Sequence, residues 1–429
     1  MTLIQEKVKD IVEVRAHKNL RDFSADPAET VAGYYFTDGT SDLMAKWLDK
    51  VASVSQGEGA AFALAGYRGV GKSHFLATLG ALVSHPELRA RVLDPHVAAG
   101  AHRLTRRHYP VTIVRRGLHE SLFDEFTEAV NLSLGIDCSQ FGDSVTDILR
   151  AAAEKAGELP LILLIDTASE RGSRVTRDDG PFLSEMAEVA KTLNIFLGVA
   201  LDDDIAGADG SNSAISRSFS IDYLDQEHLY KVVNTYVFPK HPSAQVVLSN
   251  VYNQFRELLP NFRWSEQRFN SLYPMHPAIL EVAPFVRLYV HDFALIGFAS
   301  AAAERILGRP ANSLIGLDEV FDNVEKSLRT IPDLEEAFKA YDHLNTEVVG
   351  KIPVLRRLQA KLILKALLIL SLDGQGTTAG EISAAMLIYD EEEPARALAV
   401  IDDLIRKFAE ELPGDIQILA EEGRETRYG

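Results

Sequence analysis

The sequence has 429 residues and a formal net charge of −18, with 46% of its residues apolar and 25% charged. A chain of this length exceeds one compact core, so we expect about two to four domains in a globular protein. The negative charge argues against binding nucleic acid through the general field of the protein, so any DNA contact should be local or made through a partner.

Cysteine usage and hydropathy limit the cellular context. Cys138 is the only cysteine, which excludes an intramolecular disulfide framework and a cysteine-based zinc site. The N-terminal segment MTLIQEKVKDIVEV is too charged for a signal peptide, and no apolar run approaches the roughly 20 residues that span a bilayer. We therefore expect a cytoplasmic protein that makes no membrane contact.

The first half of the chain predicts an N-terminal helical extension and then an α/β core. In residues 1–50, a polar start leads to YYFTDGTSDLMAKWLDKVA, which has helical spacing after its TDGT turn. In residues 51–238, short apolar runs alternate with helix-like segments, which predicts a parallel sheet covered by helices on both faces. The predicted strands are 60–65, 109–114, 159–165 and 194–201.

The second half predicts helices. Residues 239–352 carry helical segments separated by FPKHPSAQ and YPMHPAIL, and we expect a helical lid there, with His276 as a turn residue that packs it. In residues 353–429, three helical segments precede DIQILAEEGRETRYG, a strand and a turn. These elements predict a winged-helix-like domain, cut short where its second wing strand should continue. The predicted helices are 355–371, 379–388 and 393–411.

A phosphate-binding motif follows the first predicted strand. The segment GYRGVGKS (66–73) is a complete P-loop pattern with a strand before it and a helix after it. Its glycines allow the backbone N–H groups to face a polyphosphate, Lys72 reaches the β- and γ-phosphates, and the Ser73 hydroxyl binds Mg²⁺. The sequence therefore predicts a P-loop NTPase core that binds ATP and Mg²⁺. The predicted cofactor-binding residues are Gly66, Gly69, Gly71, Lys72, Ser73 and His74.

An acidic residue and an arginine complete the predicted site. Asp166 directly follows the apolar run LILLI, where an aspartate holds Mg²⁺ opposite Ser73; the alternative is an aspartate that caps a strand-to-loop turn. Arg217 follows a helix-like stretch and precedes an apolar strand. An arginine there is commonly offered to the phosphate of a neighbouring subunit, although an ordinary surface arginine is an equal alternative.

Several segments together resemble one protein family. AGYYFTDGTSDLMAKWL, GYRGVGKSHFLATL, LLIDTASE, SRSFSIDYL followed by VVNTYVFPK, and SLYPMHPAIL look like the N-terminal ATPase module of BREX-type phage-defence proteins, the BrxC and PglY group. The resemblance covers roughly residues 1–300. It implies an AAA-like ATPase that forms a homo-oligomer and works with other defence-system proteins to separate modified host DNA from phage DNA.

The residue after Asp166 departs from that family. Similar ATPases usually carry a glutamate there to orient the attacking water, whereas this chain has Thr167, which cannot act as a carboxylate base. Glu170 lies three residues further on and could substitute, or could be a solvated loop charge. Asp166, Glu170 and Arg217 are therefore the predicted catalytic residues, and hydrolysis stays open while nucleotide binding is expected.

Other readings keep the nucleotide site and change its use. A replication initiator or loader would need a basic recognition helix and a catalytic acid, and a nucleotide-bound scaffold would need no chemistry at all. DNA contact could come from two local basic stretches, although a solvated edge or a subunit contact is the favoured interpretation. These stretches contain Arg103, Arg106, Arg107, Arg115 and Arg116, and Arg171, Arg174 and Arg177.

Overall fold

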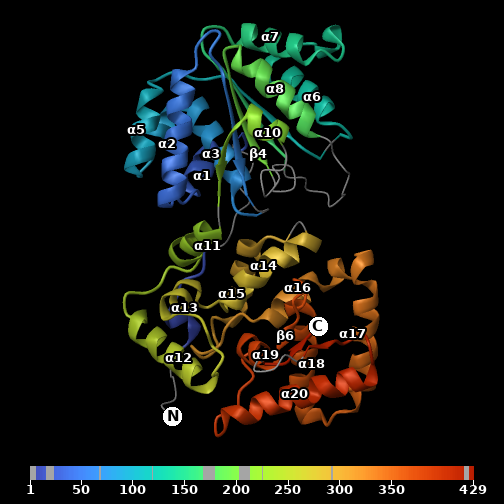
Figure 1. Cartoon of the computed structure of the whole chain (residues 1–429). Helices are drawn as coiled ribbons and strands as arrows, with labels where there is room; N and C mark the ends of the chain where they lie inside the picture. Colours follow the sequence, from blue (N-terminus) through green and yellow to red (C-terminus); the bar gives the residue numbers. More distant parts are fainter. Residues whose placement is uncertain are drawn as a thin grey trace. The chain divides into compact units, whose positions relative to one another are not determined.

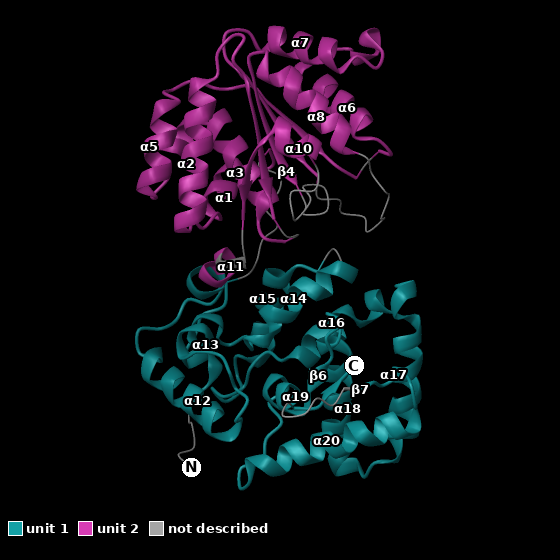
Figure 2. Cartoon of the chain, viewed as in Figure 1, with its two compact units in different colours: residues 1–17, 233–429 teal, residues 18–232 magenta. Residues whose placement is uncertain are grey.

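The computed structural model divides the chain into two compact units (Figure 2). Unit 1 comprises Met1–His17 and Val233–Gly429, and unit 2 comprises Lys18–Val232. The structure describes residues 6–15, 24–66, 69–117, 119–167, 179–201, 213–224, 226–290, 293–419 and 425–429.

Unit 2 is an α/β unit built on a five-stranded sheet (Figure 1). The strand order is β2-β3-β4-β1-β5, and every neighbouring pair is parallel. The predicted parallel sheet is therefore confirmed. Its strands are β1 (Ala60–Ala65), β2 (Val111–Arg115), β3 (Leu161–Asp166), β4 (Ile195–Leu201) and β5 (Ser220–Tyr223).

Helices cover both faces of this sheet, which explains why its strands are continuous apolar runs. Alternate residues of a strand point to opposite faces. Ala63 and Leu197 face a core shared with α6, α7 and α8, whereas Phe62 and Phe196 contact Trp47 on the other face. Figure 1 shows α2, α3 and α5 on one side of the sheet and α6, α7 and α8 on the other. The helices of unit 2 are α1 (Pro27–Ala32), α2 (Asp38–Ser53), α3 (Lys72–Ser84), α4 (Pro86–Arg89), α5 (Pro95–Arg103), α6 (Leu122–Leu134), η2 (Cys138–Phe141), α7 (Val145–Ala156), α8 (Asp179–Lys191), α10 (Ser213–Ser218) and α11 (Gln226–Val232).

The N-terminal 50 residues are divided between the two units, whereas the sequence predicted one extension. Helix α2 begins at Asp38, after the predicted turn, and buries Trp47 against the sheet of unit 2. The indole Nε1 of Trp47 also donates to Asp222 Oδ2 at 2.9 Å. Residues 6–15 instead bond unit 1, where the Val8 and Glu13 amides donate to the carbonyls of Arg309 and Pro239. Burial of the amphipathic face of α2 explains this division.

Unit 1 is mainly helical and ends in a small antiparallel sheet of order β6-β8-β7. Helices α18, α19 and α20 lie within one or two residues of the starts of the three helices predicted near the C-terminus. Helix α18 packs against α14, α16 and α17, so the predicted lid and C-terminal segments share one compact unit. The winged-helix-like identity stays a prediction. The elements of unit 1 are η1 (Val8–Asp10), η3 (Val233–Val237), α12 (Ala244–Leu258), α13 (Glu266–Leu272), α14 (Ala278–Tyr289), α15 (Leu295–Ile306), α16 (Leu317–Leu328), η4 (Pro332–Leu334), α17 (Glu335–Glu347), η5 (Val349–Lys351), α18 (Val354–Leu370), β6 (Thr377–Thr378), α19 (Ala379–Ala385), α20 (Pro394–Glu411), β7 (Ile418–Leu419) and β8 (Arg427–Tyr428).

His276 lies in an aromatic part of the unit 1 core. Its side chain is wholly buried, and its ring meets the Trp264 ring edge-on at 4.9 Å. The Ala278 amide donates to His276 Nδ1 at 3.1 Å, an arrangement that closes the turn before α14. This packing agrees with the role predicted for His276 as a turn residue. Among the described residues, no helix combines the length and the apolar character needed to cross a membrane.

Candidate nucleotide-binding site

The predicted phosphate loop connects β1 to α3 in unit 2. Its glycines Gly66, Gly69 and Gly71 have φ angles of +145°, +79° and +109°, which side chains with a Cβ rarely adopt. Gly71 lies in the left-handed region and is the N-cap of α3, which begins at Lys72. The backbone thus turns from strand into helix at the residues that the motif predicts.

The beginning of the loop packs closely against the chain that follows β5. The Leu224 amide donates to the Ala65 carbonyl at 2.9 Å. A Cβ added to Gly66 would lie 2.5 Å from the Leu224 carbonyl oxygen, well inside contact distance. Glycine at position 66 is therefore required both by its φ angle and by this close approach.

Lys72 and Ser73 occupy the first turn of α3. Lys72 is only 4% exposed, and its Nζ donates to the carbonyl of Gly66, which keeps the ammonium group inside the loop. Ser73 is partly buried on the same turn. A helix N-terminus carries positive partial charge, so the lysine and the helix present positive charge at the same place.

Asp166 lies at the same edge of the sheet as the loop. It ends β3 and pairs in register with Ala200 of β4, while Leu201 of β4 pairs with Ala65 at the end of β1. Strand β4 therefore separates β1 from β3, which places their carboxyl ends about 10 Å apart. A metal-bound polyphosphate can bridge such a distance.

Thr167 is turned into the sheet. Its side chain hydroxyl donates to the Ala200 carbonyl at 2.7 Å, its amide donates to the same oxygen at 3.3 Å, and the residue is 5% exposed. The position after Asp166 is thus committed to strand β4. Glu170, the predicted substitute base, lies outside the described residues, as does the basic stretch 171–177.

A buried ion cluster lies beside Asp166 and was not predicted. Arg116 donates through Nε to Asp179 Oδ2 at 2.9 Å and places Nη1 3.3 Å from Glu125 Oε2, and its amide donates to the Asp166 carbonyl at 2.9 Å. All three charged side chains are buried. Arg116 therefore joins β2 to the start of α8 and is removed from the predicted DNA-contacting set. Arg103, in the same stretch, is exposed and pairs with Asp49 at 2.9 Å.

The structure places His74 and Arg217 in different settings. His74 Nε2 lies 3.1 Å from the Thr30 carbonyl, and the ring meets Tyr34 edge-on at 4.9 Å. Burial raises the pKa of Tyr34, so the phenol beside His74 is neutral. Arg217 is exposed in the last turn of α10, directly before β5, and makes no ion pair with another described residue. Their predicted contacts with nucleotide stay predictions.

Two further segments meet at the loop. The Thr37 hydroxyl lies 3.0 Å from His228 Nδ1, and Lys231 pairs with Asp38 at 2.8 Å, so α11 contacts the start of α2. His228 Nε2 lies 3.8 Å from the position that a Cβ on Gly71 would occupy. No sequence signal indicates these contacts, because the partners are far apart in the chain and belong to no motif.

Comparisons with known proteins add a family match for unit 1. A family model described as DUF6079 second domain matches residues 242–427. Comparison with curated proteins gives no match. Among solved structures, the chain is similar to the Aeropyrum pernix Orc1 protein in complex with DNA, with 14% identity over 98% of this chain and 94% of that chain and a TM-score of 0.33.

Two bacterial and archaeal ATPases show comparable likeness. AMPPCP-bound DnaA from Aquifex aeolicus is 13% identical over 90% of this chain and 95% of that chain, with a TM-score of 0.30. The Walker-type ATPase of Pyrococcus abyssi is 13% identical over 90% of this chain and 92% of that chain, also with a TM-score of 0.30. At such TM-scores the likeness carries no argument about function, and the fold rests on the sheet order and register given above.

Proposed function

We propose that the loop 66–73 of unit 2 binds the triphosphate of ATP together with Mg²⁺. The loop amides and Lys72 would bind the phosphate oxygens, and Ser73 and Asp166 would hold the metal ion, which supplies charge neutralisation on the phosphates. ATP is preferred over GTP in this proposal because no guanine-reading Asn-Lys-x-Asp motif follows the sheet.

The position of Lys72 carries the proposal. Lysine is rarely buried without a partner of opposite charge, yet Lys72 is 4% exposed and is held by the Gly66 carbonyl within its own loop. The glycines around it have the positive φ angles that turn successive amides toward an anion. A polyphosphate would supply the negative charge that this loop is arranged to receive.

The test is an equilibrium titration of the full chain with a fluorescent ATP analogue in the presence of Mg²⁺. We expect Lys72→Ala to weaken binding at least about a hundredfold, because the ammonium group loses its charge-assisted bonds to phosphate. Lys155, an exposed lysine of α7 in the same unit, provides the matched control, and Lys155→Ala should bind as the unmodified chain does. Equal affinity in Lys72→Ala and Lys155→Ala would refute the proposal.

A nucleotide-holding role without efficient hydrolysis is the second candidate function, and Thr167 favours it. A general base must reach the water that it activates, whereas the Thr167 hydroxyl is buried against Ala200 and carries no carboxylate. In this version the ATP is an assembly ligand that stabilises one state of the module, and turnover is slow.

The wider role follows from the sequence resemblance alone. We propose that nucleotide state controls assembly with other phage-defence proteins, or local engagement of DNA, in a homo-oligomer. Arg217 would reach the nucleotide of a neighbouring subunit, and its exposure on α10 supports this role. Sedimentation with and without ATP checks it: ATP should shift the chain to a larger species, and Arg217→Ala should reduce that shift.

A further inference from the structure

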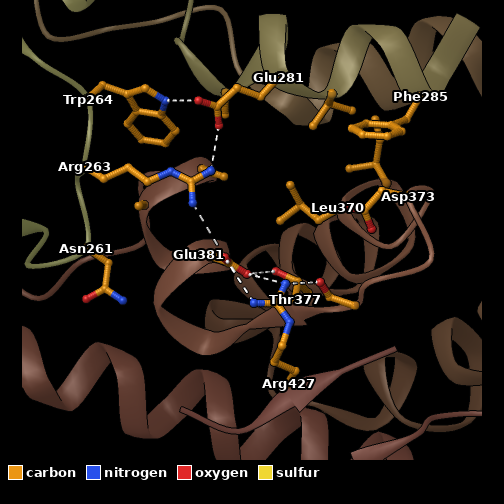
Figure 3. Close-up of a pocket in the computed structure, with 16 residues that line it drawn as sticks. Asn261, Arg263, Trp264, Glu281, Phe285, Leu370, Asp373, Thr377, Glu381 and Arg427 are labelled. Carbon is orange, nitrogen blue, oxygen red and sulfur yellow. Dashed lines mark hydrogen bonds and ion pairs between the residues drawn. The ribbon is translucent and has the colours of Figure 1, made fainter. Parts of the chain in front are cut away.

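Unit 1 contains a cavity that lies wholly among its own residues. It has a volume of about 210 Å³ and is enclosed by α14, α18, α19, the segment around Trp264 and strand β8 (Figure 3). An apolar cavity of about 150 Å³ holds a benzene molecule. The cavity in unit 1 is therefore large enough for one aromatic ring or one long side chain.

One side of the cavity is apolar. Phe285 of α14 and Leu370 of α18 lie together on this side, and Val282 of α14 lines the cavity with them. This surface can cover the body of a ring or an aliphatic stem, and the Phe285 ring can also face a cation. It therefore favours a ligand with an apolar body.

The opposite side carries charged groups that neutralise one another. Arg263 bonds Glu281 at 2.8 Å and lies 3.7 Å from Glu381, which also pairs with Arg427 at 3.3 Å. Glu281 further accepts from the Trp264 indole at 2.9 Å. Both arginines of the lining thus already face carboxylates, so this wall has no unpaired cation to attract an anionic ligand.

Asp373 is the exception among the charged lining residues. It lies beside Leu370, on the apolar side, across the cavity from Arg263 (Figure 3). Its Oδ1 accepts from the Gln375 amide at 2.8 Å, and no described lysine, arginine or histidine pairs with it. Asp373 thus adds a negative charge that the lining does not balance, next to apolar surface.

We propose that this cavity binds one cationic group carried on an aromatic or aliphatic body, with Asp373 as its ion-pair partner. An amidinium, guanidinium or ammonium group meets both features, because its charge faces the carboxylate while its body packs on Phe285 and Leu370. Two sources share this chemistry: an arginine or lysine side chain of a partner peptide, and a free small amine or amidine.

The experiment compares two probes of almost equal shape on the full chain. Benzamidine carries an amidinium on a benzene ring, whereas benzamide carries a neutral amide in its place. Ligand-observed NMR titration is expected to show benzamidine binding at least about tenfold more tightly than benzamide, since only benzamidine pairs with a buried-side carboxylate. Similar binding of the two probes, or no binding of either, would overturn the proposal.

Two variants locate the effect. Asp373→Asn keeps the shape and removes the charge, and it should weaken benzamidine at least about tenfold. Asp415→Asn makes the same chemical change at an exposed position of unit 1 outside the lining, and it should leave binding unchanged. Equal binding in the two variants would exclude Asp373 as the partner. A circular dichroism spectrum that matches the unmodified chain checks that Asp373→Asn is folded.

A third probe distinguishes the two sources. Acetyl-Ala-Arg-Ala-amide presents a guanidinium in a peptide, so binding at least as tight as benzamidine, lost in Asp373→Asn, supports a partner side chain as the occupant. Binding of benzamidine with no binding of this peptide supports a free small cation. Either result keeps the proposed chemistry, which is independent of ATP binding in unit 2.

Discussion

The two compact units accommodate buried ionisable groups in opposite ways. In unit 2, Arg116 is buried together with two carboxylates, at 2.9 Å from Asp179 and 3.3 Å from Glu125. In unit 1, His276 is wholly buried among aromatic rings, and burial lowers its pKa to about 3. One unit therefore keeps its charge by pairing it, and the other keeps its histidine neutral.

The difference corresponds to what each group has to hold in place. Arg116 also donates its amide to the Asp166 carbonyl, so the ion cluster fixes the sheet edge where the proposed metal ligand lies. His276 accepts the Ala278 amide and closes a turn within a packed core, where a neutral ring suffices. Paired charge is thus used where loops must be held precisely at a polar site, and neutral packing where a core must be filled.

The largest expected effect comes from breaking the pair in unit 2. Arg116→Ala leaves Glu125 and Asp179 as buried carboxylates without a cation, and we expect the free energy of unfolding of unit 2 to fall by about 3–5 kcal/mol. Arg103→Ala removes an exposed pair with Asp49, and its cost should stay below about 1 kcal/mol. Each unit contains one of the two tryptophans, so urea unfolding followed by Trp47 fluorescence in a Trp264→Phe background reports unit 2.

Equal losses in the two arginine variants would show that the cluster contributes no more than a surface pair. The comparison between the units would then fail on its first side.

A smaller effect separates close packing from backbone strain within unit 2. Gly66 and Gly57 both have positive φ angles, but only a Cβ on Gly66 would meet another atom, the Leu224 carbonyl oxygen at 2.5 Å. We expect Gly66→Ala to cost about 2–3 kcal/mol of unfolding free energy and Gly57→Ala about 1 kcal/mol. Gly66→Ala should also weaken ATP binding at least about tenfold, because the loop amides shift.

Titration with the fluorescent ATP analogue checks the second part of this prediction. Unchanged affinity in Gly66→Ala would mean that the close approach at Leu224 is not needed for the shape of the phosphate loop.

The smallest effect concerns pH and tests the other side of the comparison. The pKa of His276 is lowered to about 3 in the folded chain, against about 6.5 when unfolded, so its contribution to stability is complete above pH 6.5 and is lost as the pH falls toward 3. At pH 5.5 the unfolding free energy of unit 1 should be lower by about 1.4 kcal/mol. Trp264 fluorescence during urea unfolding, in a Trp47→Phe background, measures this loss.

His276→Asn is the matched control, because an amide oxygen can accept the Ala278 amide but does not titrate. Its stability should lack this part of the pH dependence. An identical pH dependence in both chains would show that His276 takes a proton in the folded state.

Much of unit 2 could be predicted because its signals are local. Strands β1, β3 and β4 are buried on both faces and so are continuous apolar runs, and the loop motif fixes its own position between β1 and α3. Strand β5 gave a weaker signal because it is a short edge strand, SIDY, that pairs with β1 alone. The two-residue strand β6 carries too little sequence to be recognised.

Contacts between distant segments could not be predicted. Nothing in the pattern of α2 indicates that Trp47 packs on Phe62 and Phe196, or that Thr37 meets His228 beside the phosphate loop. The sequence shows that Thr167 lacks a carboxylate, but only the structure shows its hydroxyl bonded to strand β4. Tertiary pairing decides each of these cases, and amphipathic patterns identify a buried face without naming its partner.

The most direct test of the account follows bound ATP and released phosphate in one sample of the full chain with Mg²⁺, beside Lys72→Ala. The account predicts that ATP binds, that Lys72→Ala abolishes binding, and that phosphate is released more slowly than about 0.01 per second, within the range of P-loop proteins that lack an assisting group. Turnover of about 1 per second that disappears in Lys72→Ala would contradict the interpretation of Thr167. Absence of bound ATP in the unmodified chain would contradict the nucleotide site itself.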